Sequence, residues 1–156
     1  MAIHNTDEDI KTVVDNIMTI ITDSSLDESF FEMVLKRLDS FGYILDVSHD
    51  GWVIAFATQK IQSQIKNECY TTNIPDGLIA TAVDMICGEF LFSKNQSGQL
   101  SIEGLDLDGA VSSIKTGDTS VNFDTGTSDE GKFLHLVDCL MNCGRGEFAC
   151  FRRMQW

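Results

Sequence analysis

The chain has 156 residues, a hydrophobic fraction of 43% and a formal net charge of −13 at pH 7. This length suits one domain that buries a core without needing disulfide bonds or bound metals. The absence of a long apolar run excludes a membrane-spanning helix of roughly 20 residues. The negative charge argues against ordinary nucleic-acid binding, which needs a basic face. The N-terminal sequence MAIHNTDEDI has no apolar signal region, so we expect no secretion, and we expect the five cysteines to be reduced thiols.

The charge is unevenly distributed along the chain. Residues 1–144 carry 8 basic and 23 acidic side chains, a net charge of −15, whereas residues 145–156 carry three arginines and one glutamate, a net charge of +2. The last twelve residues therefore differ in kind from the acidic body. A plainly solvated acidic surface with a few stray arginines is the alternative interpretation.

Two amphipathic helices are predicted near the N-terminus. Thr6 and the three acidic residues after it favour a helix start, and Ser25 with Glu28 three residues later predicts a capping box for the second helix. Gly42 suits the position just after that helix. The predicted inward faces are Ile10, Val13, Val14, Ile17, Met18 and Ile21, then Phe30, Phe31, Val34, Leu35 and Leu38.

Two further helices complete the predicted helical core of residues 6–92. The third begins at Ser48 or Asp50, and Pro75 opens the fourth, with Asn73 in the capping position. The fourth helix carries an apolar stripe broad enough to make it the central element of the core. The third helix has a stripe of Trp52, Ile54, Ala55, Thr58, Ile61, Ile65 and Cys69.

Residues 93–127 lose the helical period and are rich in Gly, Ser and Asp, which predicts a long loop. Within it, residues 111–115 and 120–123 resemble two short strands joined by a turn that contains Gly117 and Asp118. A lone two-stranded hairpin is marginal in water, so we expect it to contact either the helical bundle or another subunit. The residues assigned to this inter-subunit hairpin are Ile114, Lys115, Gly117, Asp118, Val121 and Phe123.

A closing helix is predicted over residues 128–143, followed by an extended C-terminal arm over residues 144–156. Aromatic and arginine side chains dominate interface hot spots, which favours partner binding by the arm. The alternative is that Phe148 and Trp156 fold back onto the core of their own subunit. The residues assigned to the partner-binding arm are Phe148, Phe151, Arg152, Arg153 and Trp156.

The sequence offers no convincing catalytic or metal-binding constellation. His135, Cys139 and Cys143 follow one another at four-residue steps and could share a helix face around zinc, but a fourth ligand is missing. Buried cysteine acting as a small hydrophobe is the commoner explanation. No cysteine has a catalytic signature around it, and no glycine-rich phosphate loop is present. We therefore expect no enzyme, no cofactor and no metal.

The order of these elements resembles the head–tail connector (adaptor) proteins of long-tailed bacteriophages. The resemblance spans most of residues 50–156 and is less clear over the first 45 residues. The matching residues are Ile74, Pro75, Gly77 and Leu78 at the helix opening, Ile114, Lys115, Gly117, Asp118, Val121 and Phe123 in the hairpin, and Phe151, Arg152, Arg153 and Trp156 in the arm.

The resemblance implies a small helical bundle with a hairpin or long-loop insertion and an extended arm. It further implies a virion protein, assembled in the host cytoplasm, that forms a ring, commonly of twelve copies, under the portal protein. The ring would receive the next neck or tail-completion protein, and DNA would pass through its channel without specific binding. An acidic wall suits such a channel because like charges do not hold the phosphate backbone.

Two other classes of function remain as alternatives. A small acidic inhibitor that mimics DNA would share the charge of −13 but would not need an aromatic, basic arm. Such an inhibitor should be monomeric or dimeric, whereas a connector should form rings. An accessory subunit of a cellular enzyme is the second alternative, and the neighbouring genes would distinguish it.

Overall fold

A computed structural model describes residues 5–113, 128–142 and 144–152. No strand occurs within those ranges, so the predicted mainly helical class is confirmed. The α-helices are α1 (Asp7–Ile20), α2 (Glu28–Ser40), α3 (Asp50–Cys69), α4 (Ile79–Gln96), α5 (Leu107–Ser113), α6 (Asp129–Asn142) and α7 (Phe148–Phe151), and the 3-10 helices are η1 (Asp76–Leu78), η2 (Ile102–Gly104) and η3 (Arg145–Glu147).

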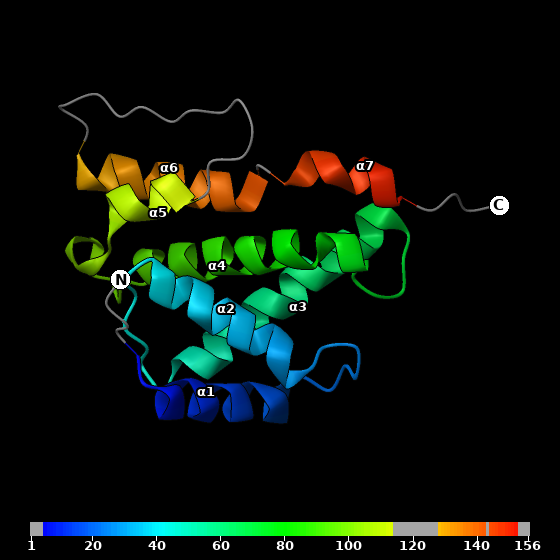
Figure 1. Ribbon diagram of the computed structural model, residues 1–156, viewed down its shortest axis with the longest axis horizontal. Coiled ribbons are helices and arrows are strands. Elements are labelled where there is room, and N and C mark those ends of the chain that lie inside the picture. The colour runs from blue at the N-terminus through cyan, green and yellow to red at the C-terminus, as the bar shows by residue number, and fades with distance from the viewer. Residues whose placement is uncertain (1–4, 114–127, 143, 153–156) are drawn as a thin grey trace.

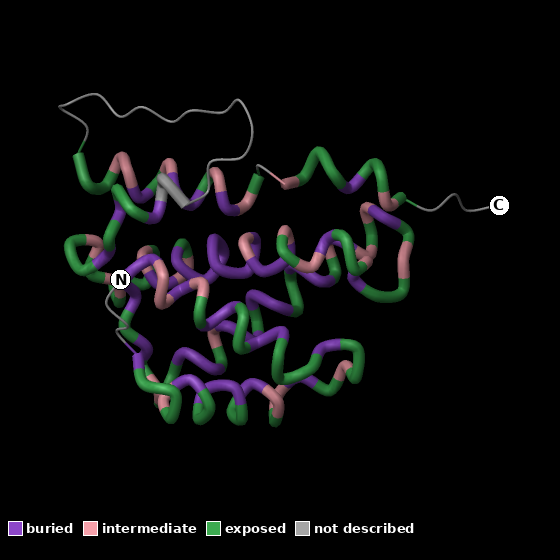
Figure 2. The backbone as a smooth tube through the Cα atoms, in the orientation of Figure 1, coloured by how far each residue is buried: buried purple, intermediate pink, exposed green. Residues whose placement is uncertain are grey.

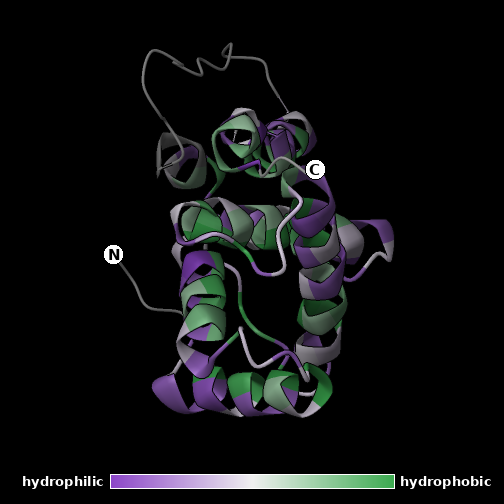
Figure 3. Cartoon of the chain, turned by 90° about the vertical axis from the view of Figure 1, so that its right-hand side faces the viewer, coloured by the Kyte–Doolittle hydropathy of each residue, from purple (hydrophilic) through white to green (hydrophobic). Residues whose placement is uncertain are grey.

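The helices form a stack with α4 in the middle. In Figure 1, α1 lies at the base, α2 and α3 cross above it, and α5, α6 and α7 lie on the far side of α4. Figure 3 shows the same stack turned by 90°. Helix α4 contacts α2, α3 and α6, and α1 is held by α2 and α3. Among the described residues, no helix is both long and apolar enough to cross a membrane.

Helix α4 is the central element, as the breadth of its apolar stripe predicts. Most of its length is buried, whereas the outer side of α1 is exposed (Figure 2). Helix α6 approaches α4 closely at Gly88, because a Cβ added there would stand 3.0 Å from Leu140 Cβ. The buried residues of α4 are Ala82, Val83, Met85, Ile86, Cys87, Gly88, Glu89, Phe90, Leu91 and Lys94.

The first two helix starts show one prediction confirmed and one wrong. Thr6 caps α1 in a reciprocal capping box with Asp9. The predicted box of Ser25 and Glu28 is absent, because the Ser25 hydroxyl and N–H both donate to the Asp23 carboxylate. Asp27 caps α2 instead and accepts a hydrogen bond from the Phe30 N–H.

Gly42 ends α2 as predicted and also connects two distant loops. Its φ is +83°, and the N–H groups of Gly42 and Tyr43 donate to carbonyls of the last turn, as in a Schellman motif. The Phe41 carbonyl accepts a hydrogen bond from the Asp106 N–H at 2.9 Å. A Cβ at residue 42 would stand 3.0 Å from that nitrogen. The close approach holds the α2–α3 loop against the segment that precedes α5.

The prediction that the fourth helix opens at Pro75 with an Asn73 cap is wrong in detail. Pro75 precedes η1, and α4 begins only at Ile79. No side-chain cap bond is present at the start of η1. Proline still serves the predicted purpose, since its fixed φ prepares the first turn and the Leu78 N–H donates to its carbonyl.

The predicted long loop over residues 93–127 is wrong for its first part. Residues 93–96 belong to α4, and η2 and α5 follow. Helix α5 packs on α6 through buried residues that include Leu107 and Ala110, and this seven-residue helix is too short to give a clear period in the sequence. Residues 111–113 are helical, so the first predicted strand is wrong there. The hairpin residues Ile114, Lys115, Gly117, Asp118, Val121 and Phe123 lie outside the described residues.

The prediction of an extended arm is wrong for residues 145–151. This segment forms η3 and α7, and α7 packs against α3. The reason is hydrophobic burial, since the Phe148 side chain is only 1% exposed. The closing helix is confirmed as α6.

Candidate functional site

The arm residues assigned to partner binding are placed differently from one another. Phe148 lies in the core, and its carbonyl lies 3.7 Å from the donor Sγ of buried Cys69. Phe151 is half-buried, and its ring occupies the space where a side chain at Gly77 would stand. The fold-back alternative is therefore correct for Phe148. Two sequence motifs that lie far apart, the helix opening around Gly77 and the arm, are thus in contact.

The arginines at this end of the molecule contact the C-terminal end of α3. Arg152 Nε donates to the Glu68 carbonyl at 2.9 Å, which satisfies one of the carbonyls that a helix end leaves without an intrahelical partner. Arg145 lies 3.4 Å from the Glu68 carboxylate. Arg153 and Trp156 lie outside the described residues. Residues 145–152, the described part of the basic end of the chain, therefore lie at the C-terminal end of α3.

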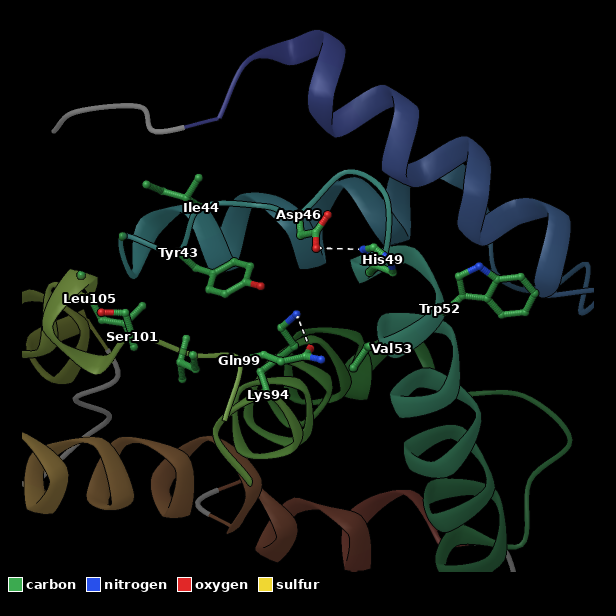
Figure 4. Close-up of a pocket in the computed structure, with 13 residues that line it drawn as sticks. Tyr43, Ile44, Asp46, His49, Trp52, Val53, Lys94, Gln99, Ser101 and Leu105 are labelled. Carbon is green, nitrogen blue, oxygen red and sulfur yellow. Dashed lines mark hydrogen bonds and ion pairs between the residues drawn. The ribbon is translucent and has the colours of Figure 1, made fainter. Parts of the chain in front are cut away.

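A cleft of about 820 Å³ lies near the other end of α3 (Figure 4). It is formed by three segments, namely the α2–α3 loop, the first turn of α3, and the stretch from the end of α4 to η2. This volume is within the range of ligand-sized pockets. The lining residues are Gly42, Tyr43, Ile44, Asp46, His49, Trp52, Val53, Lys94, Gln99, Leu100, Ser101, Gly104 and Leu105.

A buried ion pair forms the base of this cleft. Lys94 Nζ lies 2.9 Å from Asp50 Oδ1, and the two side chains are 5% and 0% exposed. The other carboxylate oxygen of Asp50 accepts hydrogen bonds from the Tyr43 hydroxyl (2.7 Å) and from the Asp46 N–H (2.8 Å). Burial and the nearby Asp50 carboxylate raise the pKa of Tyr43, so Tyr43 stays a protonated donor. These bonds connect the α2–α3 loop, α3 and α4 at the base of the cleft.

One edge of the cleft carries a carboxylate that is ionised at neutral pH. Asp46 Oδ2 lies 3.0 Å from His49 Nδ1, and the interaction with His49 is the main reason that the pKa of Asp46 is lowered. Glu103 is exposed and stands between the lining residues Ser101 and Gly104. Lys94, by contrast, directs its charge to Asp50 and Gln99. The carboxylates at the cleft are therefore Asp46, which lines it, and the exposed Glu103, which adjoins a lining residue in the chain.

An exposed aromatic pair adjoins the cleft on α3. Trp52 is 56% exposed and Phe56 is 60% exposed, and their ring centroids lie 6.4 Å apart. Trp52 also lines the cleft, at its rim (Figure 4). Two large aromatic side chains left side by side in solvent are typical of a binding surface. We call Trp52, Phe56 and the lining residues of the cleft the aromatic cleft surface.

The aromatic cleft surface was not predicted from the sequence, which assigned Trp52 to the inward stripe of the third helix. A signal did exist. Trp52 and Phe56 each stand two positions from buried Ile54, and 100° per residue places both on the opposite side of the helix. The cleft itself has no local signal, because three segments distant in the sequence form it.

The suggested zinc ligands are only partly described. Cys139 Sγ lies 3.4 Å from His135 Nε2, so the four-residue spacing does bring these two side chains together. Cys143 lies outside the described residues. Within the described part of the chain, no group of three or more His, Cys, Asp or Glu side chains is arranged to hold a metal ion.

Comparisons with protein-family models, with curated proteins and with solved structures found no match to this chain.

Proposed function

We propose that this chain is a structural subunit of a bacteriophage head–tail connector. In this proposal, copies of the chain form a ring beneath the portal protein, and the ring receives the next neck or tail-completion protein. The mature location is the virion, after assembly in the host cytoplasm. The proposed role is structural and involves no catalysis or cofactor.

The observation that carries the proposal is the position of two unlike surfaces at opposite ends of α3. The aromatic cleft surface, which includes the Asp46 carboxylate, lies at the N-terminal end. The basic segment that includes Arg145 and Arg152 lies at the C-terminal end, against Glu68. Unlike surfaces on one subunit favour head-to-tail contacts, and such contacts generate closed rings when the rotation between copies closes.

The charge of the body supports a role next to DNA without binding it. Residues 1–144 carry a net charge of −15. A channel wall with this charge repels the phosphate backbone and lets DNA slide past. The contact between the Gly77 motif and the Phe151 motif adds support, because both motifs belong to the connector resemblance and they pack together.

The test is the mass of the purified full chain, measured alone and with portal protein by native mass spectrometry and electron microscopy. A subunit weighs 17.3 kDa, so a ring of twelve copies would weigh about 208 kDa. Rings, alone or on the portal, and attachment of the protein to DNA-filled heads are the expected results. A chain that stays monomeric or dimeric with portal protein present and does not attach to heads would overturn the proposal.

The net charge also favours a second candidate, an acidic inhibitor that mimics DNA. That protein would stay small and would compete with DNA for a DNA-binding protein. Its expected signature is a strong dependence of binding on salt. The exposed Trp52–Phe56 pair has no role in such mimicry, which is why the connector is the preferred proposal.

A further inference from the structure

The aromatic cleft surface combines an apolar rim with acidic groups, and this chemistry defines what can bind it. An aromatic side chain suits the rim at Trp52 and Phe56, and a cation suits the edge at Asp46 and Glu103. A ligand that carries one aromatic and one basic group a few residues apart would therefore match both parts of the surface.

The chain itself contains such a segment. Residues 153–156 have the sequence Arg-Met-Gln-Trp and continue directly from Arg152. They supply one guanidinium and one indole, and the acidic body of any copy attracts the basic charge. Three extended steps from Arg153 to Trp156 separate their Cα atoms by about 10 Å, so the two side chains can bind separate groups.

The segment starts far from the cleft of its own subunit. Arg152 is held at the carbonyl of Glu68, which follows Trp52 by 16 positions in α3, and at about 1.5 Å per residue these positions are about 24 Å apart. Four fully extended residues span at most about 14 Å. Figure 1 shows the same separation, with α7 at the end of α3 opposite to the α2–α3 loop. The backbone of these four residues therefore falls short of Trp52 in its own subunit, whereas the cleft of a second copy sets no such limit.

We propose that residues 153–156 of one copy bind the aromatic cleft surface of a second copy. Trp156 packs against Trp52 at the rim, and Arg153 pairs with Asp46 or Glu103. The inference rests on the proposed function, because it names the contact that builds the ring. Each copy donates one segment and accepts one, so the contact is heterologous, and it forms a ring when the rotation between copies closes.

The direct test is photo-cross-linking with the full chain. Benzoylphenylalanine replaces Gln155, so that Arg153 and Trp156 stay in place. Equal amounts of unlabelled and heavy-nitrogen-labelled copies are mixed before irradiation. The expected products are mixed-isotope dimers in which the cross-link joins residue 155 to residues 44–56 or 99–105. Cross-links within one copy, cross-links to other peptides, or the absence of cross-links would each overturn the proposal.

Matched variants make the test specific. Trp52→Ala should lower the yield of these cross-links about tenfold, since a central aromatic anchor of an interface is worth at least that factor. Met33→Ala removes an exposed apolar side chain of α2 and should leave the yield within about twofold. An equal yield in the Trp52 and Met33 variants would contradict the proposal.

A charge exchange tests the basic partner. Glu103→Arg and Arg153→Glu should each lower the cross-link yield. In a mixture of the two variants, opposite charges meet again where an Arg153→Glu copy places its segment in the cleft of a Glu103→Arg copy, so the yield of that pair should recover. Glu32→Arg, at an exposed position on α2, is the control and should have no effect. Failure of the mixture to recover, with both variants folded by circular dichroism, would count against the assigned pairing.

The outcome is separable from that of the proposed function. Attachment to the portal without these cross-links would refute the segment-in-cleft contact and leave the connector role standing. These cross-links without rings or portal binding would support the contact between copies and refute the connector role.

Discussion

Lys94 Nζ lies 2.9 Å from Asp50 Oδ1, with both side chains almost completely removed from solvent. The pair joins the last turn of α4 to the first turn of α3, directly beneath the aromatic cleft surface. A buried ion pair contributes little net stability compared with apolar packing, but each charge offsets the cost of burying the other. The pair therefore holds the two helices in one relative position.

Removing one partner of this pair should be severely destabilising. Lys94→Met leaves the Asp50 carboxylate buried without its counter-charge, which costs about 3–5 kcal/mol. Urea denaturation, followed by circular dichroism, measures the loss. Lys36→Met breaks an exposed pair with Glu32 and should cost about 0.5 kcal/mol or less. Similar midpoints for the two variants would contradict the assigned role of the buried pair.

The C-terminal segment makes a second prediction about stability. Phe148 is 1% exposed, so Phe148→Ala should lower the free energy of unfolding by about 3–5 kcal/mol through lost burial and the cavity left behind. Phe56→Ala removes the same side chain from an exposed position and should change stability by about 0.5 kcal/mol or less. A small effect at Phe148 would restore the hypothesis of an arm that docks on a partner.

The helical core could be predicted because its signals are local. The helix start at Thr6, the helix end at Gly42 and the apolar period of α4 each depend on a few neighbouring residues, and the structure confirms all three. The Ser25 capping box failed because another local partner, Asp23, competed for the same hydroxyl. A local sequence pattern does not show which of two nearby partners will form the hydrogen bond.

The candidate site could not be predicted because it depends on contacts between distant segments. The sequence predicted that the Phe148 side chain binds a partner, and only the approach of α7 to α3 shows that it is buried. The cleft likewise depends on the bond between Asp106 and the Phe41 carbonyl, which joins segments 65 positions apart. Hydrophobic periodicity carries no information about such pairings.

The turn between α1 and α2 should make stability depend on pH in a defined direction. Hydrogen bonds from Ser25, then from Gln62 and Lys66, lower the pKa of Asp23 below its ordinary value of 3.8. The folded state thus binds this proton less readily than the unfolded state. The stability that Asp23 contributes is present above about pH 4 and is lost as the pH falls below that value.

The comparison of wild type with Asp23→Asn isolates this contribution. The wild type should be the more stable at pH 7, and the difference in free energy of unfolding should shrink at pH 3 and below. Asp84→Asn is the control with the opposite sign, because burial raises the pKa of Asp84 and acid then favours the wild type. A difference at Asp23 that stays constant between pH 7 and pH 3 would contradict the assignment.

The contact between α4 and α6 gives the last prediction, at Gly88. Alanine in a helix interior is favoured over glycine by about 1 kcal/mol, so helix propensity alone predicts that Gly88→Ala stabilises the protein. Packing predicts the reverse. The added Cβ would stand 2.7 Å from Met141 Cγ and 3.0 Å from Leu140 Cβ. The Met141 side chain is flexible enough to move, but Leu140 Cβ is attached to the backbone of α6 and can retreat only if the helix shifts.

Overpacking of this kind costs about 1–3 kcal/mol, which exceeds the gain in propensity. Gly88→Ala should therefore destabilise by about 1 kcal/mol, and Gly88→Val by about 3 kcal/mol, because a branched side chain adds a second clash and has lower helix propensity. Gly146→Ala is the control, since no heavy atom lies within 4 Å of its added Cβ, and its effect should stay within about 0.5 kcal/mol. A stabilised Gly88→Ala variant in urea denaturation would mean that α6 moves away from α4 at little cost.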